Sequence, residues 1–233
     1  MFFGMLRVKN EERWIERALK PLVEVCDEVF VMDDHSTDHT REIVQDTSGC
    51  VYFSSTFDGL DESRDKTWLL SRIECTLAGK DLTKNSPHWV ICVDGDEEIC
   101  TGDLHKFTQE LRGVSYSFQI LQLHDSPDQM RVDPPYDRTF RPSMFRLVKP
   151  GMVFKSQARH GGGFHCSNVP ADIGFAVIKH EPEPVRVKHY GYMGKEDRER
   201  KYKFYIEHDP GHRGWYNREC FGEPKLAGLP EGL

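Results

Sequence analysis

The sequence predicts an α/β fold in which a mostly parallel sheet is flanked by helices. Over the first half of the chain, short apolar runs alternate with helical patterns, and this order builds a parallel sheet with helices on both faces. Two of the apolar runs end in acidic clusters, Asp33-Asp34 and Asp94-Gly95-Asp96. Ligands of such sheets bind beyond the carboxyl ends of the strands, so the two clusters mark the expected site.

The expected strands are apolar runs bounded by polar or turn-forming residues. The run from Trp89 to Val93 is apolar on both faces, as a central parallel strand must be. In the second half, residues 115–123 begin as an alternating strand, and residues 185–189 are one more candidate. The remaining expected strands lie at residues 5–8, 29–32 and 51–53.

Helical periodicity fills the intervals between the first strands. Asn10 is expected to cap a first helix, and Asp38 is expected to cap a short helix over residues 40–45. Leu69, Ile73 and Leu77 recur at a spacing of four and predict a longer helix over residues 61–77. The charged segment 195–207 predicts a terminal helix. One face of the first helix is apolar, with Trp14, Ile15, Ala18, Leu19 and Leu22.

Residues 125–184 differ in composition from the rest of the chain, because glycine and proline interrupt every pattern there. Examples are Pro134-Pro135 and Gly161-Gly162-Gly163. A structureless segment of this length inside a compact domain is unusual unless it is functional. We therefore expect a loop-rich C-terminal half that includes a partly mobile lid, with the three glycines as its hinge. The alternative is a few extra strands and tight turns.

Composition excludes several classes of protein. The 31 Lys and Arg against 38 Asp and Glu give a net charge of −7, which argues against a dedicated nucleic-acid binder. The start lacks the basic and apolar regions of a signal peptide, and no segment approaches the roughly 18 apolar residues of a membrane span. The seven cysteines form no C-x-x-C pair. Reduced thiols and a cytoplasmic location are therefore expected.

The triplet Asp94-Gly95-Asp96 carries the strongest chemical signal. Two aspartates one residue apart at a strand end can both reach a single hard cation, and their oxygen ligands suit Mg²⁺ or Mn²⁺. The glycine between them allows close approach of the backbone. We expect a divalent cation, which often also binds the phosphates of a substrate, to neutralise these acids. The alternative is a solvated acidic turn.

The second cluster runs from Asp33 to Asp38. A carboxylate at the end of a strand can accept the N–H of a nucleobase, and Asp34 is the residue to which we give this role. Ser36, Thr37 and Asp38 are typical of turn and capping chemistry instead.

Three blocks in this order resemble the family 2 glycosyltransferases of the GT-A fold: MLRVKNEERWIERAL, DEVFVMDDHSTDHT and WVICVDGDEE. The resemblance covers roughly residues 4–100 and implies a GT-A-like, Rossmann-like sheet. It implies an inverting transfer of a sugar from a nucleoside-diphosphate sugar, with UDP-sugar favoured, assisted by Mn²⁺ or Mg²⁺. The acceptor would be a glycan, a lipid-linked molecule or another compound. The chain would form one domain, 1–233, with residues 1–112 binding the nucleotide sugar and residues 113–233 the acceptor.

The resemblance also implies roles for individual residues. Asp96 would hold the metal, joined by His189 of the block VKHYGY, although a lone histidine is often structural. Arg64 falls where the family often has an arginine that could pair with Asp94 or approach the nucleotide, but it could equally be a surface residue. His35 departs from the family, which commonly has glycine there. The residues expected at the nucleotide are Val8, Asn10, Glu12, Asp33, Asp34, Arg64, Asp94 and Gly95.

The catalytic base is harder to predict. Inversion needs a carboxylate or imidazole that takes the proton of the acceptor, and it should lie well after the acidic triplet. Asp172, His165 and Glu181 are the candidates, and Asp172 is favoured. Related sequences often show a His-Glu pair near this point, whereas this chain has His165-Cys166.

Other classes of protein remain as alternatives. A strand that runs into D-x-D also resembles haloacid dehalogenase phosphotransferases, but those place the motif nearer the start of the fold. A sugar nucleotidyltransferase would carry a glycine-rich basic signature after its first strand, where this chain has RVKNEE. A non-catalytic protein that binds nucleotide sugars or metal is the third alternative.

Overall fold

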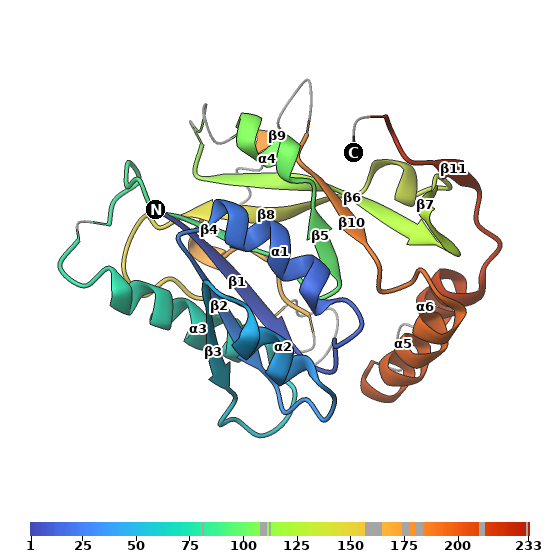
Figure 1. The fold of residues 1–233 in the computed structure, drawn as a ribbon, viewed down its shortest axis with the longest axis horizontal. Coiled ribbons are helices and arrows are strands. Elements are labelled where there is room, and N and C mark those ends of the chain that lie inside the picture. Colours follow the sequence, from blue (N-terminus) through green and yellow to red (C-terminus); the bar gives the residue numbers. More distant parts are fainter. Residues whose placement is uncertain are drawn as a thin grey trace.

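The computed structural model describes residues 1–80, 82–107, 111, 113–156, 165–173, 178–179, 184–209, 213–231 and 233. It confirms the α/β fold class, with a large twisted sheet flanked by helices (Figure 1). In the first half, the strands β1 (Phe2–Val8), β2 (Glu28–Asp33), β3 (Cys50–Ser54) and β4 (Trp89–Cys92) lie parallel in the order β4-β1-β2-β3. All four strands expected in this half are present, and their bounds differ from the expected ones by at most three residues.

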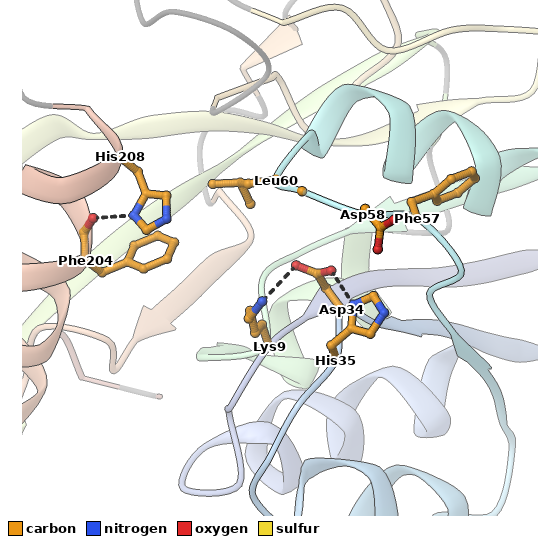
Figure 2. A pocket seen from close by; sticks show the side chains of 9 residues that line it. Lys9, Asp34, His35, Phe57, Asp58, Leu60, Phe204 and His208 are labelled. Carbon is orange, nitrogen blue, oxygen red and sulfur yellow. Dashed lines mark hydrogen bonds and ion pairs between the residues drawn. The ribbon is translucent and has the colours of Figure 1, made fainter.

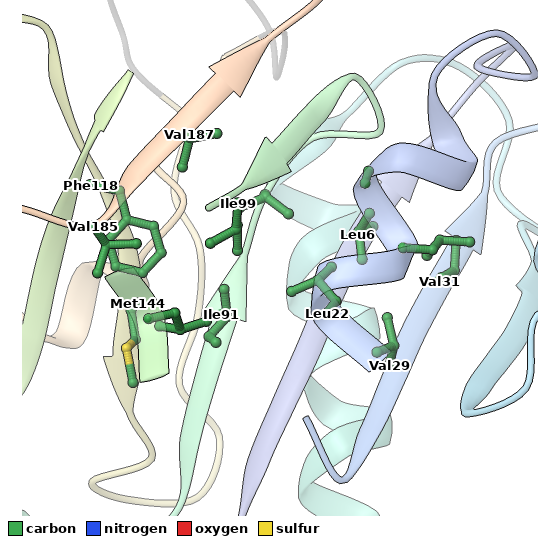
Figure 3. Close-up of a cluster of buried hydrophobic side chains, with 14 of the residues drawn as sticks. Leu6, Leu22, Val29, Val31, Ile91, Ile99, Phe118, Met144, Val185 and Val187 are labelled. Atoms are coloured by element: carbon green, nitrogen blue, oxygen red, sulfur yellow. The ribbon is translucent and has the colours of Figure 1, made fainter. Parts of the chain in front are cut away.

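The helices α1 (Ile15–Val25), α2 (Thr40–Asp46) and α3 (Glu62–Thr76) connect these strands. Successive strand residues point to opposite faces of the sheet, so each strand contributes to two cores. Leu6 and Val31 pack with Leu22 of α1 on one face (Figure 3), whereas Met5 and Met32 pack with α3 on the other. Apolar residues on both faces of β1 and β2 therefore fix the sheet between two helical layers.

The first helix begins four residues later than the sequence suggested, at Ile15. Asn10 does not cap α1: its backbone has a φ of 54°, and its side chain accepts a hydrogen bond from the Thr37 backbone N–H at 2.7 Å. Its own N–H donates to Ser36 Oγ at 2.8 Å. The loop after β1 is thus fastened to the loop after β2, which brings the ends of the two strands together.

The second half extends the sheet by antiparallel pairing. β8 (Phe140–Arg146) lies between β4 and β6 (Ser115–His124). β7 (Ser126–Arg131) pairs antiparallel with the last residues of β6. β10 (Arg186–His189) pairs with β6 and with β5 (Glu97–Ile99). The remaining elements are α4 (Thr101–Phe107), η2 (Tyr136–Arg138), η4 (Ala171–Ile173), β9 (Ile178–Lys179), α5 (Lys195–His208), α6 (Arg213–Phe221) and β11 (Leu226–Gly228).

The loop-rich character expected over residues 125–184 does not hold at β7 and β8, where the alternative of extra strands is what the structure shows. β8 is hidden in the sequence because Pro142 and two arginines interrupt its apolar pattern. The sheet accommodates the proline at a register shift between Tyr116 and Ser117 of β6. The proposed hinge glycines, 161–163, and Glu181 lie outside the described residues.

Past the edge of this sheet, α5 and α6 lie side by side as a helical pair (Figure 1). All seven cysteines carry free thiols. None of the helices among the described residues combines the length and apolar content that crossing a membrane requires.

Candidate functional site

Two adjoining cavities lie at the carboxyl ends of β1, β2 and β4. The smaller has a volume of about 310 Å³ and the larger about 1050 Å³. Lys9, Leu60 and Phe204 line both, so the two form one continuous depression. This is the place at which parallel α/β sheets bind ligands.

The smaller cavity is built around Asp34 (Figure 2). Asp34 directly follows β2, and its carboxylate accepts hydrogen bonds from Arg7 Nη2 at 2.5 Å, His35 Nδ1 at 3.2 Å and Lys9 Nζ at 3.5 Å. Burial alone would raise the pKa of Asp34, but the Arg7 charge and the other two groups outweigh it and hold the pKa below its ordinary value. Asp34 is therefore a carboxylate at neutral pH.

Aromatic and apolar side chains complete the smaller cavity. Phe57 and Leu60 come from the loop before α3, and Phe204 and His208 face Asp34 from α5 (Figure 2). The rings of Phe204 and His208 stack at 4.3 Å. His35, with a φ of 58°, adopts the left-handed turn that glycine would otherwise favour.

Asp33 lines neither cavity and has a structural role. Its carboxylate accepts the backbone N–H of Ser36 at 2.9 Å and the hydroxyl of Tyr52 at 3.0 Å, which folds the turn after β2. Asp38 accepts the N–H of Thr40 at 3.0 Å, but the N-cap of α2 is His39, so the prediction that Asp38 caps this helix is wrong by one residue.

Glu12 and Arg64 also lie outside the lining of the cavities. The exposed Glu12 accepts hydrogen bonds from the His39 backbone N–H at 2.9 Å and from His39 Nδ1 at 2.8 Å. Its neighbour Glu11 turns inward and lines the larger cavity. Arg64 donates to Asp65 and to the carbonyls of residues 58 and 59, so it shapes the loop that carries Leu60.

The acidic triplet lies in the larger cavity, and basic side chains of the second half neutralise it. Arg141 of β8 donates to Asp94 Oδ2 at 3.0 Å and also binds the buried carboxylate of Glu97. Lys201 of α5 donates to Asp96 Oδ2 at 2.6 Å. Basic side chains of the chain itself therefore share in neutralising these acids, in addition to the divalent cation that the sequence analysis expects.

His189 is brought to Asp96 by the pairing of β10 with β5. Its Nδ1 lies 2.8 Å from Gln122 Oε1, and its Nε2 lies 3.4 Å from Asp96 Oδ2. A metal-binding histidine typically donates its other ring N–H to such an oxygen, which fixes the ring. Asp96 and His189 thus form a pair with the chemistry of a metal site.

No group of three His, Cys, Asp or Glu side chains suited to a metal ion occurs in the described part of the chain. Mg²⁺ and similar ions need fewer protein ligands when substrate phosphates and water complete the coordination. The pair of Asp96 and His189 fits that kind of site. Glu11 adds a buried oxygen, Oε2, that has no hydrogen-bond partner among the described residues.

Two glycines keep this region open. A Cβ on Gly95 would lie 3.0 Å from both Val8 Cγ1 and Glu11 Cγ. A Cβ on Gly191, just after β10, would lie 2.0 Å from Asp96 Oδ2. Both positions allow a close backbone approach that a side chain would prevent.

Of the two favoured base candidates, only His165 lines a cavity. Its Nε2 lies 3.2 Å from the hydroxyl of Tyr216, which donates to Asp209 Oδ2 at 2.7 Å. Asp172 instead binds Lys149 Nζ at 2.8 Å and the Val153 N–H at 2.9 Å, away from both cavities. The geometry therefore separates Asp172 from the site. The predicted residues that line the cavities are Val8, Asn10, Asp34, Asp94, Gly95, Asp96, His165 and His189.

Comparison with known proteins gives three similarities. An uncharacterized glycosyltransferase of Rickettsia bellii (strain RML369-C) is 27% identical over 140 residues, which is 57% of this chain and 42% of that protein. The chain thus spans less than half the length of this relative. The crystal structure of S. aureus TarS 1-349 matches with a TM-score of 0.50 at 14% identity, over 94% of this chain and 70% of that one. This likeness shows the fold.

Glucosyl-3-phosphoglycerate synthase from Mycobacterium tuberculosis, in complex with Mn²⁺, UDP and phosphoglyceric acid, matches at a TM-score of 0.34 and 21% identity, over 52% of this chain and 43% of that one. The model of the family described as "Glycosyl transferase family 2" matches residues 6–162 of the chain. With more than half of its residues matched, the chain belongs to glycosyl transferase family 2.

Proposed function

We propose that the chain transfers a sugar from a nucleoside-diphosphate sugar to an acceptor, with inversion at the anomeric carbon. The observation that carries this proposal is the pair of adjoining cavities at the strand ends. One holds a fixed carboxylate among aromatic side chains, and the other begins at the acidic triplet. A nucleotide sugar has the corresponding parts, with a base at one end and a diphosphate and sugar at the other.

The smaller cavity is the proposed base site. Asp34 is ionised and accepts hydrogen bonds, so it suits an N–H of the base, while Phe57 and Phe204 offer apolar surface to the ring. A pyrimidine is the smaller class of base and suits a cavity of about 310 Å³. A UDP-sugar is therefore the first donor to test.

The diphosphate would lie in the larger cavity, where Lys9, Arg200 and Lys201 supply positive charge. Asp96 and His189 would hold Mn²⁺ or Mg²⁺, and such a cation would supply positive charge to the leaving diphosphate. Asp94, fixed by Arg141, keeps the backbone of the triplet in place.

His165 is the proposed base. The acceptor oxygen forms a bond to the anomeric carbon, its proton passes to the imidazole, and the bond from that carbon to the diphosphate oxygen breaks with its electron pair. Because the Tyr216 hydroxyl donates to Asp209, it accepts from the Nε2–H of His165, which leaves the lone pair on Nδ1. Tyr216 and Asp209 thus set the tautomer of the base.

Replacing His165 by asparagine is expected to lower turnover of the nucleotide sugar by about 10²-fold, the smaller end of the range for a general base. Nucleotide affinity should stay unchanged, because His165 is not part of the base site. Turnover rate and calorimetric titration measure the two effects separately. An equal loss of affinity would show that His165 only holds the cavity together.

The acceptor would enter on the far side of the larger cavity. Tyr136, Phe140 and Trp215 line it there, and Trp215 is 44% exposed. Glu219 fixes this wall, because it accepts hydrogen bonds from Trp215 Nε1 at 2.8 Å and from the Tyr136 hydroxyl at 3.3 Å. A rigid aromatic surface of this kind suits the apolar face of a sugar ring, so a glycan or a lipid-linked sugar is the proposed acceptor.

The proposal is tested by incubating the protein with a panel of nucleotide sugars and Mn²⁺. A glycosyltransferase releases nucleoside diphosphate, and its acceptor or water receives the sugar. A nucleotidyltransferase would instead need pyrophosphate and would release nucleoside triphosphate and sugar phosphate. A binding protein would release neither product, although a ligand at about 100 times its Kd would still add roughly 2.7 kcal/mol of stability.

Replacing Asp34 by alanine is expected to weaken binding of the nucleoside diphosphate by on the order of 1.5–3 kcal/mol, because a hydrogen bond to a charged group is lost. Titration calorimetry with Mn²⁺ present measures the change. Glu12→Gln is the matched control, since this exposed carboxylate should leave the affinity as it is. Native affinity in the Asp34 variant would reduce Asp34 to a structural residue.

A further inference from the structure

Lys201 holds an unusual position for a lysine on a charged helix. Its side chain is only 14% exposed, and its Nζ lies 2.6 Å from Asp96 Oδ2. The same oxygen faces His189 Nε2 at 3.4 Å. The ammonium group of Lys201 is therefore in direct contact with the acid that would hold a metal.

The space around this contact is small. A Cβ on Gly191 would lie 2.0 Å from Asp96 Oδ2 and 2.3 Å from Lys201 Nζ, so the backbone at Gly191 presses against the ion pair. A divalent cation at Asp96 Oδ2 would stand next to the ammonium group, and two like charges repel strongly at that separation when they are shielded from water. Lys201 and a cation therefore compete for this oxygen.

We propose that Lys201 is a donor-binding residue that exchanges partners. Without donor, its ammonium group neutralises Asp96, and when a cation and a diphosphate bind, it leaves Asp96 and donates to the diphosphate oxygens. This inference rests on the proposed function, since it assigns a role within the same site.

The surroundings of Lys201 support such an exchange. Its Nζ lies 4.9 Å from the centre of the Tyr192 ring, which stabilises a cation near the wall of the cavity. Glu11 lines the same cavity and has a carboxyl oxygen with no hydrogen-bond partner among the described residues, so a second oxygen is available as an acceptor. A lysine suits the role, because its flexible stem carries three donors that can change partners.

Mn²⁺ binding without nucleotide tests the first half of the exchange. Titration followed by the electron paramagnetic resonance signal of free Mn²⁺ gives the Kd for the native protein and for Lys201→Met. We expect Lys201→Met to bind Mn²⁺ at least about tenfold more tightly, because the competing ammonium group is gone. Lys203→Met, an exposed neighbour on the same helix, is the control and should match the native protein.

The second half is tested with saturating Mn²⁺ and UDP, GDP, CDP or dTDP. For the diphosphate that binds most tightly, Lys201→Met should raise the Kd about tenfold, opposite in direction to its effect on Mn²⁺. If Mn²⁺ affinity is unchanged or weaker, or if none of the diphosphates loses affinity, the exchange is wrong. A purely structural lysine would weaken both ligands together.

Two further results separate this inference from the proposed function. Lys201→Arg keeps the positive charge and should bind Mn²⁺ with the affinity of the native protein. This variant provides a test if the methionine variant fails to fold. Release of nucleoside diphosphate by a protein that never binds Mn²⁺ would overturn the exchange and leave the transferase intact. Tighter Mn²⁺ binding by Lys201→Met, in a protein that turns over no nucleotide sugar, would support the exchange and contradict the transferase.

Discussion

Replacing Asp96 by asparagine is expected to lower turnover of a nucleotide sugar by about 10³–10⁴-fold, since a cation at the diphosphate supplies several kcal/mol of charge stabilisation. Asp96 offers the oxygen that His189 and Lys201 both face. An asparagine keeps the shape of the side chain but removes its charge. The measurement is release of nucleoside diphosphate with Mn²⁺ present.

Asp96→Asn also removes the partner of Lys201, so a control must separate the loss of the metal from the loss of this ion pair. A buried ammonium group without a partner destabilises the protein, so a fall in activity could reflect unfolding. The double variant Asp96→Asn, Lys201→Met removes both charges and should unfold at a temperature close to that of the native protein while remaining inactive. Native turnover in Asp96→Asn, or in excess chelator, would contradict the proposed metal site.

Replacing Arg141 by methionine is expected to destabilise the folded protein by about 3–5 kcal/mol, the range for breaking a buried ion pair by removing one partner. Arg141 is the cation that binds Glu97, whose side chain is 0% exposed. Glu97 Oε1 already lacks a hydrogen-bond partner among the described residues, so the variant would leave this carboxylate almost uncompensated. Chemical denaturation measures the free energy of unfolding.

Two variants check the cause of that loss. Glu97→Gln in the Arg141→Met background removes the uncompensated charge and should recover part of the stability, whereas a general packing defect would not respond. Arg138→Met, an exposed arginine of the same cavity wall, should change the free energy of unfolding by no more than about 0.5 kcal/mol. A loss of similar size in Arg138→Met would remove the specific role given to Arg141.

The first half of the fold could be predicted from the sequence because its information is local. β1, β2 and β4 are mostly apolar, whereas the apolar pattern of β8 is interrupted by Pro142 and two arginines. β8 forms where it does because β4 and β6 supply partners on both sides, a condition that only the folded chain creates. Strand propensity depends on such neighbours more than on the residues themselves.

Some residues of the site could also be predicted from the sequence, and others could not. Asp34, Asp94 and Asp96 follow predictable strands, so their shared location could be predicted from the order of the elements. Arg141 contacts Asp94 across 47 residues of the chain, and Lys201 contacts Asp96 across 105 residues, so no spacing in the sequence relates them to the triplet.

The prediction of Glu12 at the nucleotide was off by one residue. Its neighbour Glu11 lines the larger cavity, whereas Glu12 binds His39 on the exposed surface. Asp172 and Arg64 were misplaced for a related reason, since Lys149 and the carbonyls of residues 58 and 59 engage them elsewhere.

The helix α5 is a wall of both cavities. Phe204 and His208 face Asp34 in the smaller one, and Lys201 contacts Asp96 in the larger. Anything that shifts the equilibrium position of this helix in one cavity changes the free energy of binding in the other. Thermodynamic linkage makes that influence reciprocal, so a nucleoside and a metal ion would alter each other's affinity by the same factor without sharing a single contact.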